Sequence, residues 1–238
     1  MPIRKIELND FDPDAIAVYE RFRGLPRAEH IAKPATLHVL ARLCRRERLE
    51  RVLELGGGLG TISYLLLKGS PARLDVYEHD PYFAGKLAEN LREFSGRFQI
   101  LNDYRLLPPL RDYDLVVVDG GQARKGEDDP SHGFNESVWH YLSYLKNVRF
   151  VYVEGHRHIQ RTWVRKALAR RYRYSLERHA DTQYQGEVLN GGVLIACRPS
   201  NSRLGKLLNY LFWEVVEWQT VRNFFVYRFR RIKLALSK

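Results

Sequence analysis

The chain has 238 residues, of which 45% are hydrophobic and 28% are charged. This composition is ordinary for a globular protein, which excludes extensive disorder, and no segment approaches the ~18 consecutive apolar residues of a membrane span. The formal net charge of +11 favours an anionic partner such as a nucleic acid, a phosphorylated substrate or an acidic membrane surface.

The cysteines and the first residues bear on where the protein works. Cys44 and Cys197 are far apart and lack metal-ligand spacing, so we expect neither a zinc site nor a disulfide scaffold. Residues 1–14 carry charges and proline where a signal peptide would need an apolar run. We therefore expect a cytoplasmic protein.

Residues 1–50 are expected to form a helical arm. The run Asp12-Pro13-Asp14 is typical of a helix start, because proline suits the first turn and an acidic side chain complements the helix dipole. A second helix is expected after Pro34, where apolar residues recur at helical spacing: Leu37, Leu40, Ala41 and Cys44.

From residue 51 onward, short apolar runs alternate with helical patterns. The apolar runs predict strands at 51–55, 74–78, 98–101, 114–119 and 150–154. The helical patterns between them cover 60–68, 82–94, 135–146 and 159–171. Strands that alternate with helices of this length predict βαβ units and a parallel sheet covered on both faces.

The last two predicted strands, 172–178 and 192–198, have no helical pattern between them. Residues 181–191 are expected to form a hairpin loop, so that the sheet would end in an antiparallel edge strand. The sequence thus predicts an α/β protein with a Rossmann-like, doubly wound, mostly parallel seven-stranded sheet over residues 51–200. An N-terminal helical arm precedes this sheet and a C-terminal helix follows it.

Residues 201–238 form a basic, aromatic tail with a helical pattern. Residues 203–238 hold eight lysines and arginines and two glutamates, a net charge of +6. One helical stripe contains Leu204, Leu208, Leu211, Val215 and Trp218. The tail is predicted to pack on the domain or on a second subunit of a homodimer, or to lie on an anionic membrane surface, where the protein would be peripheral at the inner face. Nucleic-acid binding is the least favoured alternative, since no RNA-binding module is recognisable.

The sharpest motif is a glycine-rich turn after the first strand of the sheet, in the run Glu54-Leu55-Gly56-Gly57-Gly58-Leu59-Gly60-Thr61. The backbone of such a turn can approach a ligand closely because glycine has no Cβ. A dinucleotide fingerprint requires Gly-x-Gly-x-x-Gly, and the third position here is Thr61. The pattern acid-x-Gly-x-Gly-x-Gly is met instead, by Glu54, Gly56, Gly58 and Gly60.

With this motif, the chain resembles the class I S-adenosylmethionine (SAM)-dependent methyltransferases over about residues 30–198. In that family an acid at the end of the second strand binds both ribose hydroxyls, and Glu78 occupies that place. An acidic or amide residue after the third strand lies near the adenine amino group; Asn102 and Asp103 stand there, and Asp103 is the better match. The resemblance implies a methyltransferase that binds SAM through Glu54, Gly56, Gly58, Gly60, Glu78, Asn102 and Asp103.

The fourth strand ends in Asp119-Gly120-Gly121-Gln122. These residues lack the Asn/Asp-Pro-Pro-aromatic motif of many relatives that methylate amino groups. They are more similar to the small-molecule O-methyltransferases, in which the acid that ends this strand can bind a divalent metal. The resemblance therefore implies O-methylation of a small molecule or of a glycan or lipid-linked sugar, with Asp119 in the acceptor site.

The fifth strand ends in Glu154, and His156 and His158 follow it. Strands four and five of this fold are neighbours about 4.8 Å apart, so Asp119 and Glu154 are expected to face each other at the carboxyl ends of the strands. The two carboxylates could then bind Mg²⁺, with His156 or His158 as general base. Alternatively Glu154 pairs with Arg157, and no clear third metal ligand is present.

The segment 122–133 is long and charged, and it is predicted to be either a surface loop or an element that binds an anionic acceptor. Two other functions stay open for the whole chain. The first is RNA methylation, which the charge favours and the missing Pro-Pro motif disfavours. The second is a non-catalytic membrane- or partner-binding protein on the same fold, which the intact glycine motif disfavours.

Overall fold

The structure is a computed structural model, and it describes most of the chain as far as residue 199. The described residues are 3–4, 10–120, 138, 140–155, 157–169, 171–179, 182–184, 187–189, 192–199, 202–205 and 207. Within these residues, no helix is long and apolar enough to cross a membrane.

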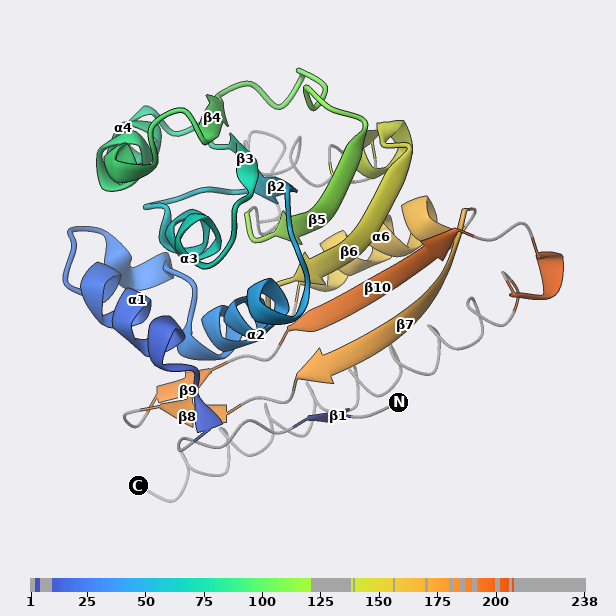
Figure 1. The fold of residues 1–238 in the computed structure, drawn as a ribbon, viewed down its shortest axis with the longest axis horizontal. Coiled ribbons are helices and arrows are strands. Elements are labelled where there is room, and N and C mark those ends of the chain that lie inside the picture. Colours follow the sequence, from blue (N-terminus) through green and yellow to red (C-terminus); the bar gives the residue numbers. More distant parts are fainter. Residues whose placement is uncertain are drawn as a thin grey trace, which may run out of the picture.

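An eight-stranded sheet lies at the centre of the described structure (Figure 1). Its strands are β1 (Ile3–Arg4), β2 (Arg51–Leu55), β3 (Arg73–Tyr77), β4 (Phe98–Leu101), β5 (Asp112–Val118), β6 (Asn147–Val153), β7 (Tyr172–His179) and β10 (Val193–Pro199). They are ordered β1-β7-β10-β6-β5-β2-β3-β4, and the run from β6 to β4 is parallel throughout. A separate two-stranded sheet joins β8 (Thr182–Tyr184) to β9 (Glu187–Leu189).

The antiparallel strand lies inside the sheet and not at its edge, which corrects the sequence prediction. Strand β10 pairs antiparallel with both neighbours, and Val193 lies opposite Val153 of β6 and Arg178 of β7. The chain turns back after β7 through the β8–β9 hairpin, so β10 fills the space between β7 and β6. The two-residue β1, which pairs with β7 in parallel, adds an eighth strand to the seven that were predicted.

Helices cover both faces of the sheet. One face packs against α1 (Pro13–Arg23), α2 (Pro34–Arg46), α3 (Thr61–Gly69) and α4 (Pro81–Asn90). The other face packs against α6 (His158–Ala169) and the helical residues 138 and 140–144. Two short 3₁₀ turns, η2 (Ala28–His30) and η3 (Arg92–Phe94), and the helical residues 203–205 and 207 complete the described helical structure. The single helix predicted over 82–94 is therefore divided, because α4 ends at Asn90.

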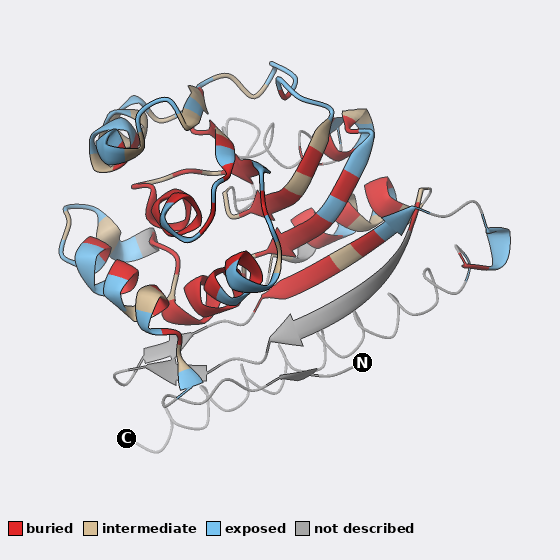
Figure 2. Ribbon diagram, in the orientation of Figure 1, coloured by how far each residue is buried: buried red, intermediate tan, exposed pale blue. Residues whose placement is uncertain are grey.

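Successive residues of the central strands enter different cores. Val52 packs in the core beneath α1, α2 and α3, whereas Leu53 packs in the core beneath α6. Figure 2 shows buried residues along β5 and β6 and on α2 and α3. A strand that is buried on both faces is apolar along its whole length, which explains why these strands were recognisable as apolar runs.

The two arm helices begin where the sequence predicts. The Asp12 side chain accepts a hydrogen bond from the backbone N–H of Asp14 (3.0 Å), which caps α1, and Pro34 is the first residue of α2. Side chains of both helices belong to the core that also contains β2 and α3. The arm thus shares a hydrophobic core with the sheet.

Candidate functional site

The glycine-rich turn connects β2 to α3. Gly56, Gly58 and Gly60 have φ values of +97°, +51° and +88°, in the left-handed region that glycine adopts most readily. A Cβ on Gly56 would lie 2.4 Å from the Cα of Gly120, so the turns after β2 and β5 pass in backbone contact. A Cβ on Gly58 would meet nothing within 4 Å. The turn is therefore closed at Gly56 and open at Gly58.

Glu78 follows β3, and its carboxylate faces the open part of this turn. One oxygen accepts a hydrogen bond from the backbone N–H of Gly58 (2.7 Å), and the other accepts one from the N–H of Asp80 (2.9 Å). The residue is only 6% exposed. A carboxylate has about four acceptor positions, so these two bonds fix its orientation and leave capacity for a diol.

Glu54 lies within β2, two positions before Gly56, and is fully buried. The Ser63 hydroxyl of α3 donates to its carboxylate (2.5 Å). Burial raises the pKa of Glu54 well above its usual range; the bond from Ser63 opposes that shift, and the nearby Asp119 and Glu78 add to it. The structure thus gathers three acidic side chains from the ends of β2, β3 and β5.

Asn102 and Asp103 follow β4, and both were predicted to lie near an adenine. Asn102 is exposed. The carboxylate of Asp103 accepts from Arg105 through both Nε (3.0 Å) and Nη2 (2.8 Å), and these hydrogen bonds lower the pKa of Asp103. The side chain of Asp103 therefore has a partner of its own in this structure, and its contact with adenine stays a prediction.

Aromatic residues lie beside Glu78 and were not predicted from the sequence. The hydroxyl of Tyr104 lies 3.0 Å from Nδ1 of His79, and that nitrogen is 3.6 Å from the Glu78 carboxylate. Tyr104 also stacks on Tyr77, with 5.9 Å between ring centroids. Tyr77 is fully buried and Tyr104 is half-buried, so of these two rings only that of Tyr104 has surface to offer a planar ligand. Only the adjacency of Tyr77 and Glu78 at a strand end hints at this arrangement in the sequence.

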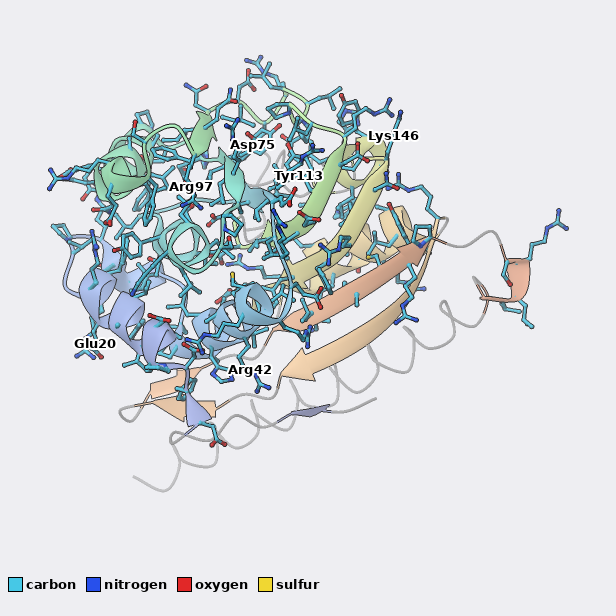
Figure 3. All side chains as sticks on the ribbon, viewed as in Figure 1. Glu20, Arg42, Asp75, Arg97, Tyr113 and Lys146 are labelled. Carbon is cyan, nitrogen blue, oxygen red and sulfur yellow. The ribbon has the colours of Figure 1, made fainter. Side chains whose placement is uncertain are left out.

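A side-chain hydrogen bond joins β5 to β3. Tyr113 of β5 donates its hydroxyl to Asp75 of β3 (2.6 Å), and both residues are labelled in Figure 3. Burial raises the pKa of Asp75. The backbone N–H of Leu110 donates to the same hydroxyl (3.3 Å), which ties the loop between β4 and β5 to the sheet.

The structure places Asp119 and Glu154 beside each other at the carboxyl ends of β5 and β6. Between them lies Arg157, whose Nη2 is 3.0 Å from an oxygen of Asp119 and 3.2 Å from one of Glu154. The structure therefore contains the ion pair between Glu154 and Arg157 that was the alternative to a metal site. Among the described residues, no group of three His, Cys, Asp or Glu side chains is arranged to bind a metal.

The surroundings of Asp119 shift the pKa of its carboxyl group. Burial raises its pKa well above the usual range, and the neighbouring charge of Glu154 raises it further, while Arg157 opposes both effects.

The start of α2 reaches the same site. The Thr36 hydroxyl lies 3.5 Å from Glu154 and accepts a hydrogen bond from the buried Tyr152 hydroxyl (3.2 Å). This contact brings the helical arm to the acidic pair across 118 residues of sequence. Local patterns carry no signal for such a contact, and Thr36 was not among the predicted site residues.

Several predicted features fall outside the described residues. These are His156, the segment 122–133 and residues 208–238, and the side chain of His158 is likewise not described.

The described residues fit an adenosyl cofactor on three observations. Gly58 is open where a Cβ would otherwise stand, and Glu78 is fixed beside it with free acceptor capacity. The hydroxyl of Thr61, the first residue of α3, is buried without a hydrogen-bond partner among the described residues. Buried polar atoms are normally paired, so an unpaired one at this turn favours a polar ligand.

The comparisons with known proteins agree with this geometry at the level of the fold. No family model and no curated protein sequence matches the chain. Among solved structures, it is similar to the O-methyltransferase of tomaymycin synthesis from Streptomyces achromogenes, in complex with SAM (TM-score 0.53, 19% identity, 78% of this chain and 90% of that one). It is also similar to a SAM-dependent O-methyltransferase from Thermotoga maritima (TM-score 0.54, 16% identity, 78% and 72%).

A third similar structure is a candidate RNA methyltransferase from Pyrococcus horikoshii (TM-score 0.51, 17% identity, 77% of this chain and 96% of that one). At these identities the likeness concerns the fold. The chain has the Rossmann-like α/β fold of the class I SAM-dependent methyltransferases.

Proposed function

We propose that this protein is a SAM-dependent methyltransferase that acts on a hydroxyl group of a small molecule or glycan. The observation that carries the proposal is the pairing of the open glycine at position 58 with the fixed carboxylate of Glu78. Solved structures with the same fold support it, since those named above include two O-methyltransferases, one of them in complex with SAM.

Each proposed cofactor contact uses a group that the fold has already positioned. Glu78 would accept hydrogen bonds from both ribose hydroxyls, because Gly58 and Asp80 hold its carboxylate in place. The backbone of Gly56, Gly58 and Gly60 would follow the cofactor, with Glu54 behind it, and Asn102 or Asp103 would lie near the adenine.

Asp119 would act as the general base toward the acceptor hydroxyl. SAM, when bound, supplies a methyl group on a positively charged sulfur. Asp119 would accept the proton of the acceptor hydroxyl when the methyl group is transferred to that oxygen. Alignment of this kind can contribute on the order of 7–11 kcal/mol to catalysis. Glu154, and His156 by prediction, would complete the acceptor site.

A second candidate function is methylation of RNA. It is supported by the similarity to a candidate RNA methyltransferase and by the net charge of +11. The residues after Asp119 disfavour it, because they lack the Pro-Pro motif. Transfer of labelled methyl groups to a polar small-molecule extract, and not to total RNA, would favour the first proposal.

We also propose that the basic tail, residues 203–238, lies on an anionic membrane surface, where a lipid-linked acceptor would be found. At its described start, Leu204 is 67% exposed and Leu207 is 55% exposed, so these side chains are not buried against the domain. The net charge of the tail, +6, suits anionic headgroups. Packing of the tail in a homodimer is the alternative outcome.

Calorimetric titration of the full chain with SAM and, separately, with NAD tests the cofactor. We expect micromolar binding of SAM and none of NAD. Glu78→Ala should weaken SAM binding by about a hundredfold, because two charge-assisted hydrogen bonds are lost. Glu89→Ala is the matched control, since Glu89 is an exposed glutamate that pairs with Lys86 on nearby α4. A chain that binds no SAM would contradict the proposal and favour a non-catalytic role on this fold.

A further inference from the structure

Arg157 is bound to two carboxylates from neighbouring strands. Its Nη2 contacts Asp119 and Glu154, and its Nη1 donates to the carbonyl of Gly120 (3.2 Å). The three charged side chains are only 14% (Arg157), 16% (Asp119) and 15% (Glu154) exposed. Water therefore screens the electrostatic attraction between Arg157 and the two carboxylates only weakly.

Two carboxylates held this close need a cation between them. Without one, their mutual repulsion would force a proton onto one of the pair or drive the side chains apart. A guanidinium group meets the need well, because it is always charged and its planar fork matches carboxylate oxygens. A magnesium ion would require octahedral oxygen coordination, and the described residues supply no third acidic or histidine ligand.

The first turn of α6 is built around the same strand ends. The backbone N–H of Arg161 donates to the carbonyl of Arg157 (2.9 Å), so Arg157 is the residue directly before the helix and its carbonyl accepts the first helical hydrogen bond. Gln160 donates to the carbonyl of Gly120, and Arg161 donates to the carbonyl of Gly155. These three side chains are spaced i, i+3 and i+4, so they lie on one face of the helix. The position of Arg157 is thus fixed by several independent contacts.

We propose that Arg157 stands where a divalent metal ion was expected, and that it is a positioning residue that holds Asp119 and Glu154 for the acceptor. Asp119 and Glu154 then take part in methyl transfer without a divalent metal between them. Only the role of Asp119 and Glu154 toward the acceptor rests on the proposed function. The ion pairs of Arg157 with the two carboxylates do not depend on it.

Manganese binding to the full chain tests the proposal without any activity measurement. Free Mn²⁺ is measured by its electron paramagnetic resonance, and Asp119→Asn identifies the part of the binding that depends on the pair. The wild type and Asp119→Asn should bind the same amount of Mn²⁺, because the carboxylate pair of the wild type is already occupied by Arg157. Arg157→Met should bind one Mn²⁺ at least about tenfold more tightly than the wild type, and the double variant Arg157→Met/Asp119→Asn should lose that site.

Thermal unfolding provides the second measurement. Arg157→Met should lower Tm by on the order of 5 °C, because it leaves two buried carboxylates without a cation, and Mn²⁺ should restore part of the loss. Arg157→Lys keeps the positive charge but not the planar fork of the guanidinium group. Its Tm should lie between those of the wild type and Arg157→Met. Arg73→Met is the control, since Arg73 is an exposed arginine at the opposite end of the sheet.

Two results would overturn the proposal. One is a wild-type Mn²⁺ site that disappears in Asp119→Asn; this result needs no folded Arg157→Met chain. The other is an Arg157→Met chain that melts with the wild type and gains no site. Neither result bears on SAM binding, so a failure here is distinguishable from a failure of the proposed cofactor.

Discussion

Gly56 and Gly58 belong to the same turn, but their surroundings predict opposite effects of substitution. A Cβ at Gly56 would overlap the backbone of Gly120, and its φ of +97° is strained for any other residue. Gly56→Ala should therefore destabilise the fold by on the order of 3 kcal/mol, which corresponds to a Tm loss of about 6–12 °C. Differential scanning fluorimetry measures the change.

Gly58→Ala is the matched substitution. Its φ of +51° lies in the left-handed region that alanine can adopt at a cost of about 1 kcal/mol, and its Cβ would enter open space. The fold should therefore tolerate the change, whereas SAM binding should weaken by tenfold or more because the methyl group occupies the proposed cofactor position. Equal Tm losses for the two variants, or unchanged SAM binding in Gly58→Ala, would contradict this interpretation of the turn.

The junction of α1 and α2 predicts a pH dependence of stability. Nδ1 of His38 accepts a hydrogen bond from the backbone N–H of Asp12 (2.9 Å), so the ring must be neutral there, and the residue is only 5% exposed. Burial lowers the pKa of His38, as do the charges of Arg42 and Arg45, while Asp10 and Asp12 oppose the shift.

The sign of the effect follows from linkage. Above about pH 6.5 the ring is neutral in both the folded and the unfolded chain, and its contribution to stability is constant. As the pH falls below that value, the unfolded chain takes up a proton that the folded chain resists, so stability decreases. His38→Gln should flatten the fall of Tm between about pH 7 and pH 5. His140→Gln, at an exposed histidine, is the control and should keep the wild-type slope.

Elements were predictable from the sequence where their cause is local. The apolar run of β2, the glycines after it and the acid at position 78 are set by a few neighbouring residues, and the structure brings these groups together. The place of β10 was wrong, because its pairing partners Val153 and Arg178 are chosen by the path of the chain and not by local pattern.

The acceptor side shows the same limit at the scale of side chains. The order of the strands allowed the approach of Asp119 and Glu154 to be predicted, since parallel neighbours end at the same edge of the sheet. Which cation lies between them could not be settled from spacing alone, although Arg157, Gln160 and Arg161 share one helix face. The contact of Thr36 with Glu154 joins residues 118 positions apart and has no local signature.

Part of the positive net charge of the molecule comes from arginines that stabilise the fold. Several described arginines stabilise the fold by donating to main-chain carbonyls near helix ends: Arg97 to Ser70 and Ala72, and Arg171 to Leu142 and Leu145. Such bonds satisfy carbonyls that a helix leaves unpaired, and the positive charge complements the helix dipole. The overall charge of +11 is thus weak evidence for a nucleic-acid partner.

The charge of the tail makes a separate prediction for the whole molecule. Vesicles that contain anionic lipid should sediment with the full chain but not with a chain that lacks residues 203–238, and neutral vesicles should sediment with neither. Each basic residue near an anionic surface contributes about 1 kcal/mol, so replacing Arg228, Arg230 and Arg231 by Gln should weaken binding about a hundredfold. The same change at three exposed arginines of the domain, Arg42, Arg73 and Arg92, should have little effect. If the shortened chain binds vesicles as well as the full chain does, the tail has another role. A full chain with the mass of a dimer in solution and a shortened chain with the mass of a monomer would identify that role as dimerisation.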